Sequence, residues 1–338
     1  MKKDLDGPML DNDANLIREV LGEYQGAIVE LLMELASLES PSLEPDTQKP
    51  VQDVLRRSFE DLGFESHFIE GSNTGGHLHF RRAGHPQGEG PVQLLLGHTD
   101  TVWPVGTLKE MPVEYDEEED VLRGPGVFDM KGGLVQMVFA LKALSELNFL
   151  PSVIPTVFLN SDEEISSTES QAHIVGLAQQ SNRVLVLEPA LGPEGWIKTT
   201  RRGVGQFEIR VIGRAAHSGL APEEGASAIQ EMSHVIQTLH DLTDTQRGIG
   251  VNVGTVSGGT RANVVAAESK AIVDVRVSTR EDARWVEAAI RNLEATTTGT
   301  RLDIEGAIDR DPMEATVANK VLWEAVRGCG RRLGLDLV

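Results

Sequence analysis

Three short apolar runs, each followed at once by polar or acidic residues, constrain the fold of this chain more than any other feature. The runs cover residues 92–96, 156–159 and 184–187. A short apolar run bounded by turn residues is typical of a strand buried on both faces, as in a parallel sheet. Residues 131–147, between the first two runs, have apolar side chains at helical spacing. This order predicts an α/β domain with a mostly parallel sheet and helices on both faces.

The pattern changes after about residue 200. Polar and apolar residues alternate in 206–212, 251–256 and 271–277, as they do in strands with one exposed face. Residues 226–242 and 281–293 have helical periodicity. We therefore expect an inserted α+β sandwich, with helices on one face of an antiparallel sheet.

The predicted domain boundaries follow from this change. Residues 1–201 form the first part of the first domain, 202–312 form the inserted domain, and 313–338 begin the segment that returns to the first domain. Two further helices are predicted in the first domain, over 15–38 and 50–62, where Ser40-Pro41-Ser42 breaks the first one.

Composition excludes several classes of function. The chain of 338 residues has 31 basic and 52 acidic residues and a net charge of −21, which disfavours binding to nucleic acid or to an anionic membrane surface. No apolar run approaches the ~18 residues that a membrane span needs. The N-terminus lacks the apolar stretch of a signal peptide, so we expect a cytoplasmic protein. Cys329 is the only cysteine, which excludes an intramolecular disulfide and a cysteine-based metal site.

Polar side chains follow each predicted core strand, and another lies in the glycine-rich turn 124–133. In chain order they are His98, Asp100, Asp129, Asp162, Glu163, Glu164 and Glu188. Ligand sites in open α/β sheets lie outside the carboxyl ends of the strands, so we expect these side chains to meet at one edge. Each motif alone is compatible with solvated surface, but their shared placement favours a metal site. Imidazole and carboxylate ligands suit zinc or, less selectively, cobalt or manganese.

These motifs resemble those of the M20 family of metallopeptidases, in its glutamate carboxypeptidase (carboxypeptidase G2-like) and ArgE/DapE-type branch. The matching segments are Leu-Leu-Gly-His98-Thr-Asp100, Gly-Pro-Gly-Val-Phe-Asp129-Met-Lys-Gly-Gly, Ser-Asp-Glu163-Glu164 and Leu-Glu188-Pro. The resemblance extends from about residue 25 to about residue 300. It implies that the first domain is catalytic and that the inserted domain is a lid and dimerisation domain.

The resemblance implies a two-zinc site. Asp129 would bridge both ions, His98 and Glu188 would complete one, and Glu164 would bind the other. It also implies a cis peptide bond after Asp129. A bridging role suits a carboxylate, because its two oxygens can bind two cations.

The resemblance assigns two further residues to this site. Glu163 would be the general base that takes a proton from the attacking water. Asp100 would hold the other ring nitrogen of His98, an arrangement that orients metal-binding histidines.

The inserted domain contains a second group of matching residues. The loop 213–219 resembles the family's histidine loop, in which His217 would reach the partner subunit's active site and stabilise the tetrahedral oxyanion. Asn263 and Arg276 match residues that hold the substrate, and the Arg fork can bind a carboxylate through two hydrogen bonds. The family has Pro where this chain has Ala266.

The histidines depart from the family pattern. The nine histidines all lie at or before residue 240, whereas the family supplies its last zinc ligand, a His, after the inserted domain. We therefore expect a chain that stops before this ligand and holds close to one tightly bound zinc. We interpret His77 and His79 as structural or surface residues, and the acidic run 116–120 as a solvated hairpin tip.

The predicted function is a zinc-dependent hydrolase that cleaves peptide or N-acyl amide bonds next to a free carboxylate. Its substrate would be a small peptide or an N-acyl amino acid, and it would be a homodimer through residues 202–312. Two alternatives remain: an N-acyl amino acid deacylase of the same family, and a non-catalytic, dimeric metal-binding pseudoenzyme.

Overall fold

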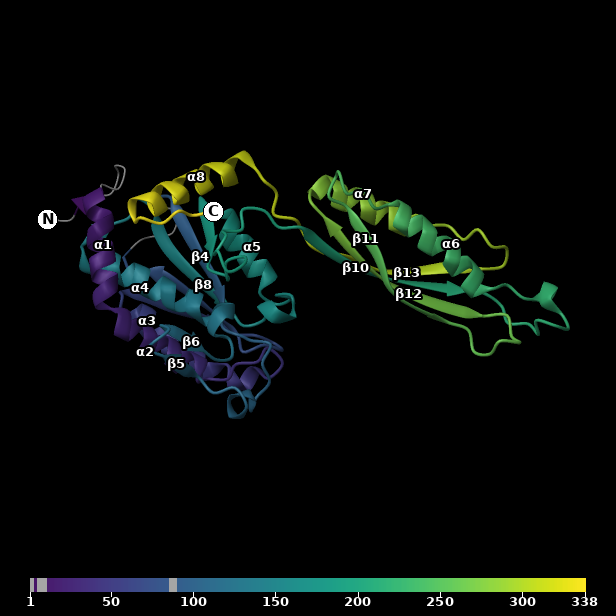
Figure 1. The fold of residues 1–338 in the computed structure, drawn as a ribbon, viewed down its shortest axis with the longest axis horizontal. Helices are drawn as coiled ribbons and strands as arrows, with labels where there is room; N and C mark the ends of the chain where they lie inside the picture. The colour runs from purple at the N-terminus through teal and green to yellow at the C-terminus, as the bar shows by residue number, and fades with distance from the viewer. Residues whose placement is uncertain (1–2, 5–10, 85–89) are drawn as a thin grey trace. The chain divides into compact units, whose positions relative to one another are not determined.

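Figure 1 shows the computed structural model of this chain, which describes residues 3–4, 11–84 and 90–338. The chain divides into two compact units. Unit 1 contains Met1–Trp196 and Arg327–Val338, and unit 2 contains Ile197–Val326. His85, one of the nine histidines, lies outside the described residues.

A five-stranded sheet forms the centre of unit 1. Its strands, in spatial order, are β2 (Phe64–Ile69), β3 (His77–Arg82), β8 (Ile154–Asn160), β4 (Val92–His98) and β9 (Arg183–Val186). β4 pairs in parallel with both β8 and β9, whereas β3 is antiparallel to β8 and β2. β2, β8, β4 and β9 therefore run in one direction and β3 runs in the other, which confirms the mostly parallel sheet.

Helices cover both faces of this sheet, as predicted. α2 (Gln25–Ala36), α3 (Lys49–Glu60) and α4 (Gly132–Glu146) pack on the face that carries Leu78 and Val157. On the opposite face, His173 of α5 (Gln171–Gln179) stacks on Phe158, with ring centroids 6.4 Å apart. Unit 1 also contains two minor strand pairs: β1 (Lys3–Asp4) with β7 (Phe149–Leu150), and β5 (Glu114–Asp116) with β6 (Val121–Arg123). The turn between β5 and β6 is the predicted acidic hairpin tip.

The single helix predicted over 15–38 is wrong in one respect. The structure has two helices, α1 (Asp11–Glu23) and α2, which meet at Tyr24. Gly22 and Gly26 flank this break, and glycine weakens a helix because it loses more backbone entropy on folding than other residues.

Unit 2 contains a four-stranded antiparallel sheet with two helices on one face. Its strands, in spatial order, are β11 (Gly250–Gly258), β12 (Glu268–Val277), β10 (Gly203–Ile212) and β13 (Arg301–Arg310). Phe207, Ile209 and Val211 of β10 alternate toward a core shared with α6 (Ala228–Asp241) and α7 (Arg280–Arg291). This arrangement confirms the α+β prediction, although β13 was not predicted.

The last helix, α8 (Val317–Arg332), spans the sequence boundary between the two units. Among the described helices, none is both long enough and apolar enough to cross a membrane.

Candidate metal centre

His98, the last residue of β4, lies at the centre of the candidate site and is only 1% exposed. Its Nε2 atom lies 3.1 Å from Oδ1 of Asp129 and 3.4 Å from Oε1 of Glu188. Its Nδ1 atom lies 2.9 Å from the backbone oxygen of Asp100 and 3.4 Å from Oδ1 of the same residue. The backbone oxygen of Asp100 can only accept a hydrogen bond, so Nδ1 carries a proton that it donates to Asp100.

The Nε2 side of His98 therefore fits a cation. A neutral imidazole with its proton on Nδ1 would direct a lone pair from Nε2 toward the two carboxylates. This contact is repulsive unless a proton or a metal ion lies between the groups. A divalent cation would satisfy the imidazole and both carboxylates together.

The pKa values of the site reflect the same crowding of negative charge. Burial alone lowers the pKa of His98, but hydrogen bonds with Asp100, Asp129 and Glu188 outweigh it and raise this pKa to about 12. Burial and the nearby Asp129 carboxylate raise the pKa of Glu164 to about 7. Each group shifts toward the protonation state that reduces the negative charge, which is also the effect of a bound cation.

The five predicted ligand and base residues converge in the structure. Two sets each offer three ligand atoms within 4.8 Å of one another. One set is His98, Glu163 and Glu188, and the other is His98, Asp129 and Glu164. The geometry thus agrees with the predicted meeting at one sheet edge, while the role of each residue stays a prediction.

Close packing of α4 brings Asp129 and Glu188 to this edge. Asp129 lies in the turn before α4, and the peptide bond between Asp129 and Met130 is cis. A Cβ atom on Gly133 would lie 2.0 Å from the backbone oxygen of Leu187. Only glycine therefore allows the start of α4 to approach the segment that leads to Glu188.

Asp100 and Asp162 hold the turn that carries the two glutamates. The backbone N–H groups of Glu163 and Glu164 donate to Oδ1 and Oδ2 of Asp100, at 3.2 and 3.1 Å. Asp162 accepts from Oγ of Ser170 at 2.6 Å, within the same segment. Burial raises the pKa of Asp162, but hydrogen bonds from Ser170 and neighbouring groups outweigh it and lower this pKa, so Asp162 holds its donors as an anion.

Ser42 is a site neighbour that the sequence did not reveal. Its hydroxyl donates to Oδ2 of Asp100 at 2.6 Å. The pattern Ser40-Pro41-Ser42 indicates only a helix break, because a serine after a proline carries no signal of a distant partner.

Two of the three residues predicted to bind substrate lie together in unit 2. The backbone N–H of Ser218 donates to the backbone oxygen of Asn263 at 3.1 Å, next to His217. The N–H of Gly219 donates to Nδ1 of His217 at 3.2 Å, so the proton of the neutral imidazole is on Nε2. His217 is exposed and presents this N–H as a hydrogen-bond donor.

Arg276 lies elsewhere in unit 2. It is near the end of β12, whereas the loops of His217 and Asn263 lie close to the start of that strand. Its guanidinium forms two hydrogen bonds of 3.0 Å with Asp274. Within unit 2, the structure therefore does not bring Arg276 to His217 and Asn263.

Comparison with known proteins relates both units to one group of enzymes. Residues 199–298 match the peptidase dimerisation domain of the M20 peptidases. The chain is 27% identical to carboxypeptidase G2 of Pseudomonas sp. (strain RS-16) over 286 residues, which cover 83% of this chain and 66% of that protein. It is 27% identical to the succinyl-diaminopimelate desuccinylase of Caulobacter sp. (strain K31) over 277 residues, or 76% of this chain and 68% of that protein. The chain thus spans about two thirds of the length of these relatives.

A solved structure has the same fold as this chain. The M20 family metallo-carboxypeptidase Sso-CP2 from Sulfolobus solfataricus superposes with a TM-score of 0.65. The superposition covers 92% of this chain and 84% of that one, at 17% identity, and so shows the shared fold.

Proposed function

We propose that this chain, which is similar to M20 peptidases, is a metal-dependent hydrolase of peptide or N-acyl amide bonds next to a free carboxylate. The observation that carries this proposal is the position of the buried His98, whose Nε2 atom lies 3.1 Å from a carboxylate oxygen of Asp129 and 3.4 Å from one of Glu188. Glu163 and Glu164 add two more carboxylates within ligand distance. Such a set of groups fits divalent metal chemistry at a carbonyl.

Zinc is the ion that we propose, with cobalt or manganese as substitutes, because zinc favours imidazole and carboxylate ligands. His98, Asp129, Glu164 and Glu188 would hold it. A bound zinc ion polarises the scissile carbonyl and lowers the pKa of water.

Glu163 would move the proton. Its carboxylate would accept a proton from water as the water oxygen bonds to the carbonyl carbon. It would then give that proton to the amide nitrogen as the carbon–nitrogen bond breaks. Asp100 supports this role, because it holds the backbone N–H of Glu163.

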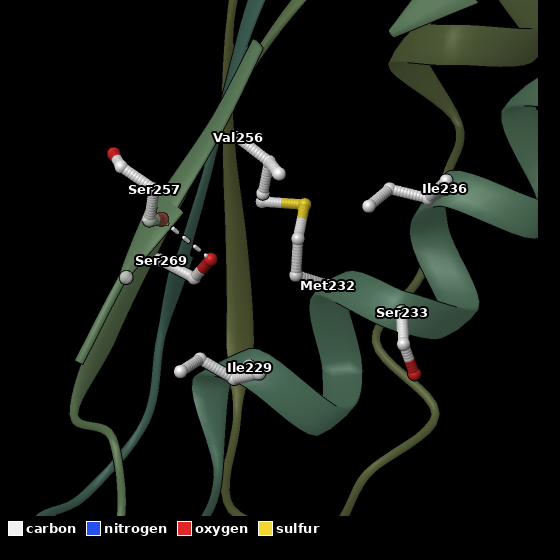
Figure 2. A pocket seen from close by; sticks show the side chains of 8 residues that line it. Ile229, Met232, Ser233, Ile236, Val256, Ser257 and Ser269 are labelled. Atoms are coloured by element: carbon white, nitrogen blue, oxygen red, sulfur yellow. Dashed lines mark hydrogen bonds between the residues drawn. The ribbon is translucent and has the colours of Figure 1, made fainter. Parts of the chain in front are cut away.

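Unit 2 would supply the dimer contact and the substrate contacts. We propose that two copies of the chain associate along β11, which is an edge strand of the described sheet. Figure 2 shows the pocket between β11 and α6, lined by Ile229, Met232, Ser233, Ile236, Val256, Ser257, Gly258 and Ser269. The apolar side chains that line it include Val256, which is 57% exposed.

In such a dimer, His217 would donate its Nε2–H to the developing oxyanion in the partner's site. Asn263 would bind the substrate beside His217, and Arg276, which lies apart from these two residues within unit 2, would leave Asp274 to bind the free carboxylate of the substrate.

Two other candidate functions predict different results with these substrates. The similarity to a succinyl-diaminopimelate desuccinylase favours an N-acyl amino acid deacylase as the second candidate. A non-catalytic, dimeric metal-binding protein is the third.

An assay with zinc and a panel of dipeptides and N-acyl amino acids separates these candidates. Each substrate has a matched form with its carboxylate amidated. Hydrolysis of dipeptides, with the amidated forms much slower, supports the peptidase. Turnover of N-acyl amino acids alone supports the deacylase. Zinc binding without turnover of any substrate supports the non-catalytic protein.

A further inference from the structure

The carboxylate of Asp100 connects three parts of unit 1. Its Oδ1 accepts the N–H of Glu163, and its Oδ2 accepts both the N–H of Glu164 and the hydroxyl of Ser42. The bond from Ser42 is the shortest of the three, at 2.6 Å, against 3.2 Å and 3.1 Å. Asp100 and Ser42 are both buried, so water does not compete for the bond between them.

The segment that carries Ser42 is itself firmly held beside the site. The N–H of Thr101 donates to the backbone oxygen of Ser40 at 2.9 Å, and the N–H of Ser42 donates to the oxygen of Thr101 at 3.2 Å. The buried Lys131 donates from Nζ to the oxygen of Leu38 at 2.7 Å. The hydroxyl of Ser42 therefore acts from a fixed position.

We propose that Ser42 is a positioning residue for the hydrolytic reaction: it fixes the carboxylate of Asp100, which in turn fixes the backbone of Glu163 and Glu164. Without the hydroxyl, Oδ2 of Asp100 loses its shortest partner. The carboxylate can then rotate toward Nδ1 of His98, which lies 3.4 Å from Oδ1, and its bonds to the two glutamate N–H groups weaken. This inference rests on the proposed function for its kinetic consequence.

Ser40 provides a matched control. Its side chain is also buried, and its hydroxyl donates to the backbone oxygen of Thr99 at 2.8 Å. It lies two residues from Ser42 but has no bond to Asp100. Ser42→Ala and Ser40→Ala each remove one buried hydroxyl that contacts a backbone oxygen of the same loop, Thr101 at 3.5 Å for Ser42 and Thr99 at 2.8 Å for Ser40, and only Ser42→Ala also removes a bond to Asp100.

The kinetic experiment uses the zinc-loaded full chain and its best substrate. We expect Ser42→Ala to lower kcat about tenfold with KM within about twofold, because chemistry and not binding depends on the position of Glu163. Ser40→Ala should keep the wild-type kcat. Its thermal stability should fall by about as much as that of Ser42→Ala. Ser42→Thr, which keeps the hydroxyl, should restore kcat.

A second readout does not depend on turnover. Titration with Co²⁺, followed by visible absorption, reports the geometry of the ligands around the ion. We expect a changed spectrum for Ser42→Ala, and wild-type spectra for Ser40→Ala and Ser42→Thr. If Ser42→Ala does not fold, Ser42→Cys keeps the side-chain volume with a weaker donor and tests the same bond.

The outcomes separate this inference from the proposed function. A wild-type protein that hydrolyses no substrate overturns the proposed function, while the cobalt spectra still test the role of Ser42. A Ser42→Ala protein with wild-type kcat and spectrum overturns the role of Ser42. Equal losses of kcat in Ser40→Ala and Ser42→Ala also overturn it, because a general loss of packing would then explain both.

Discussion

The Nε2 atom of His98 lies 3.1 Å from Oδ1 of Asp129, although 31 positions separate these residues in the chain. β4 ends at His98, and the chain then returns to the sheet edge at the turn before α4. The backbone N–H of His98 also contacts Sδ of the buried Met130, at 3.2 Å. The imidazole is held by Asp100 through Nδ1 and faces carboxylates through Nε2.

The first prediction concerns metal binding by His98. Replacement of His98 with Ala removes the single imidazole that both ligand sets share. We expect zinc affinity to fall at least ~100-fold, measured by calorimetric titration and by metal analysis after dialysis. His67→Ala is the control, because His67 is exposed on β2. Wild-type zinc affinity in His98→Ala would exclude this site.

The second prediction separates two roles for Glu163. As a base, Glu163 moves a proton, so Glu163→Gln should lower kcat about 10²–10⁴-fold with zinc content unchanged. As a ligand in the set with His98 and Glu188, Glu163 would contribute to the affinity for zinc, and Glu163→Gln would then release zinc. Activity and zinc content measured on one sample decide between these roles. Glu118→Gln, in the turn between β5 and β6, is the control and should alter neither.

Much of this site could be predicted because its residues follow strands. His98 ends β4, and Glu163 and Glu188 follow β8 and β9, so the parallel topology alone brings them to one edge. The bond from Ser42 to Asp100 could not be predicted, since it joins residues 58 positions apart through an irregular segment. Regular secondary structure gives a periodic signal, whereas a single hydroxyl in a loop gives none.

The missed strand β13 has a similar physical explanation. Leu302, Ile304 and Ile308 alternate along it, but Gly306 interrupts the apolar pattern. A Cβ atom on Gly306 would lie 2.1 Å from the backbone oxygen of Gln206. The glycine is thus explained by close approach of the neighbouring strand β10, and that approach is visible only in the folded sheet.

The third prediction is a loss of stability in acid that depends on His79. This residue is 9% exposed, and its Nε2 lies 3.0 Å from Oγ1 of Thr156. That hydroxyl donates to the backbone oxygen of Phe80, so Nε2 of His79 is the donor in the first bond. Burial, together with Arg81 and then His67, lowers the pKa of His79 to about 4.

The sign of the pH effect follows from this pKa. An unfolded histidine has a pKa near 6.5, so below that value the unfolded chain binds a proton that folded His79 does not. The contribution of neutral His79 to the stability of the folded protein is therefore fully present above pH 6.5, and it decreases as the pH falls toward 4. Between pH 7 and pH 5 we expect His79 to cost roughly 2 kcal/mol of stability.

Urea unfolding at pH 7 and pH 5 tests this prediction. His79→Gln keeps an N–H donor for Thr156 but does not titrate, so its loss of stability between the two pH values should be smaller than that of the wild type. His234→Gln is the control, because His234 is exposed on α6. An unchanged pH dependence in His79→Gln would contradict the low pKa.

The fourth prediction concerns His217 in the proposed dimer. If His217 stabilises the oxyanion, His217→Ala should lower kcat about 10²–10³-fold, with zinc content and sedimentation unchanged. Val256→Lys, on the exposed edge strand β11, should produce monomers and a comparable loss of kcat. A wild-type chain that sediments as a monomer and is fully active would remove the role of His217 in a partner's site.

Mixed dimers give the sharpest test of this role, because Glu163 and His217 would act from different subunits. His217→Ala and Glu163→Gln subunits are each expected to be nearly inactive alone. In a mixed dimer, one of the two sites would combine an intact Glu163 with an intact His217 from the partner. Equal amounts of the two variants, exchanged to equilibrium, should therefore recover about a quarter of the wild-type activity. If His217 acts within its own subunit, no site regains both groups, and the mixture stays as inactive as its components.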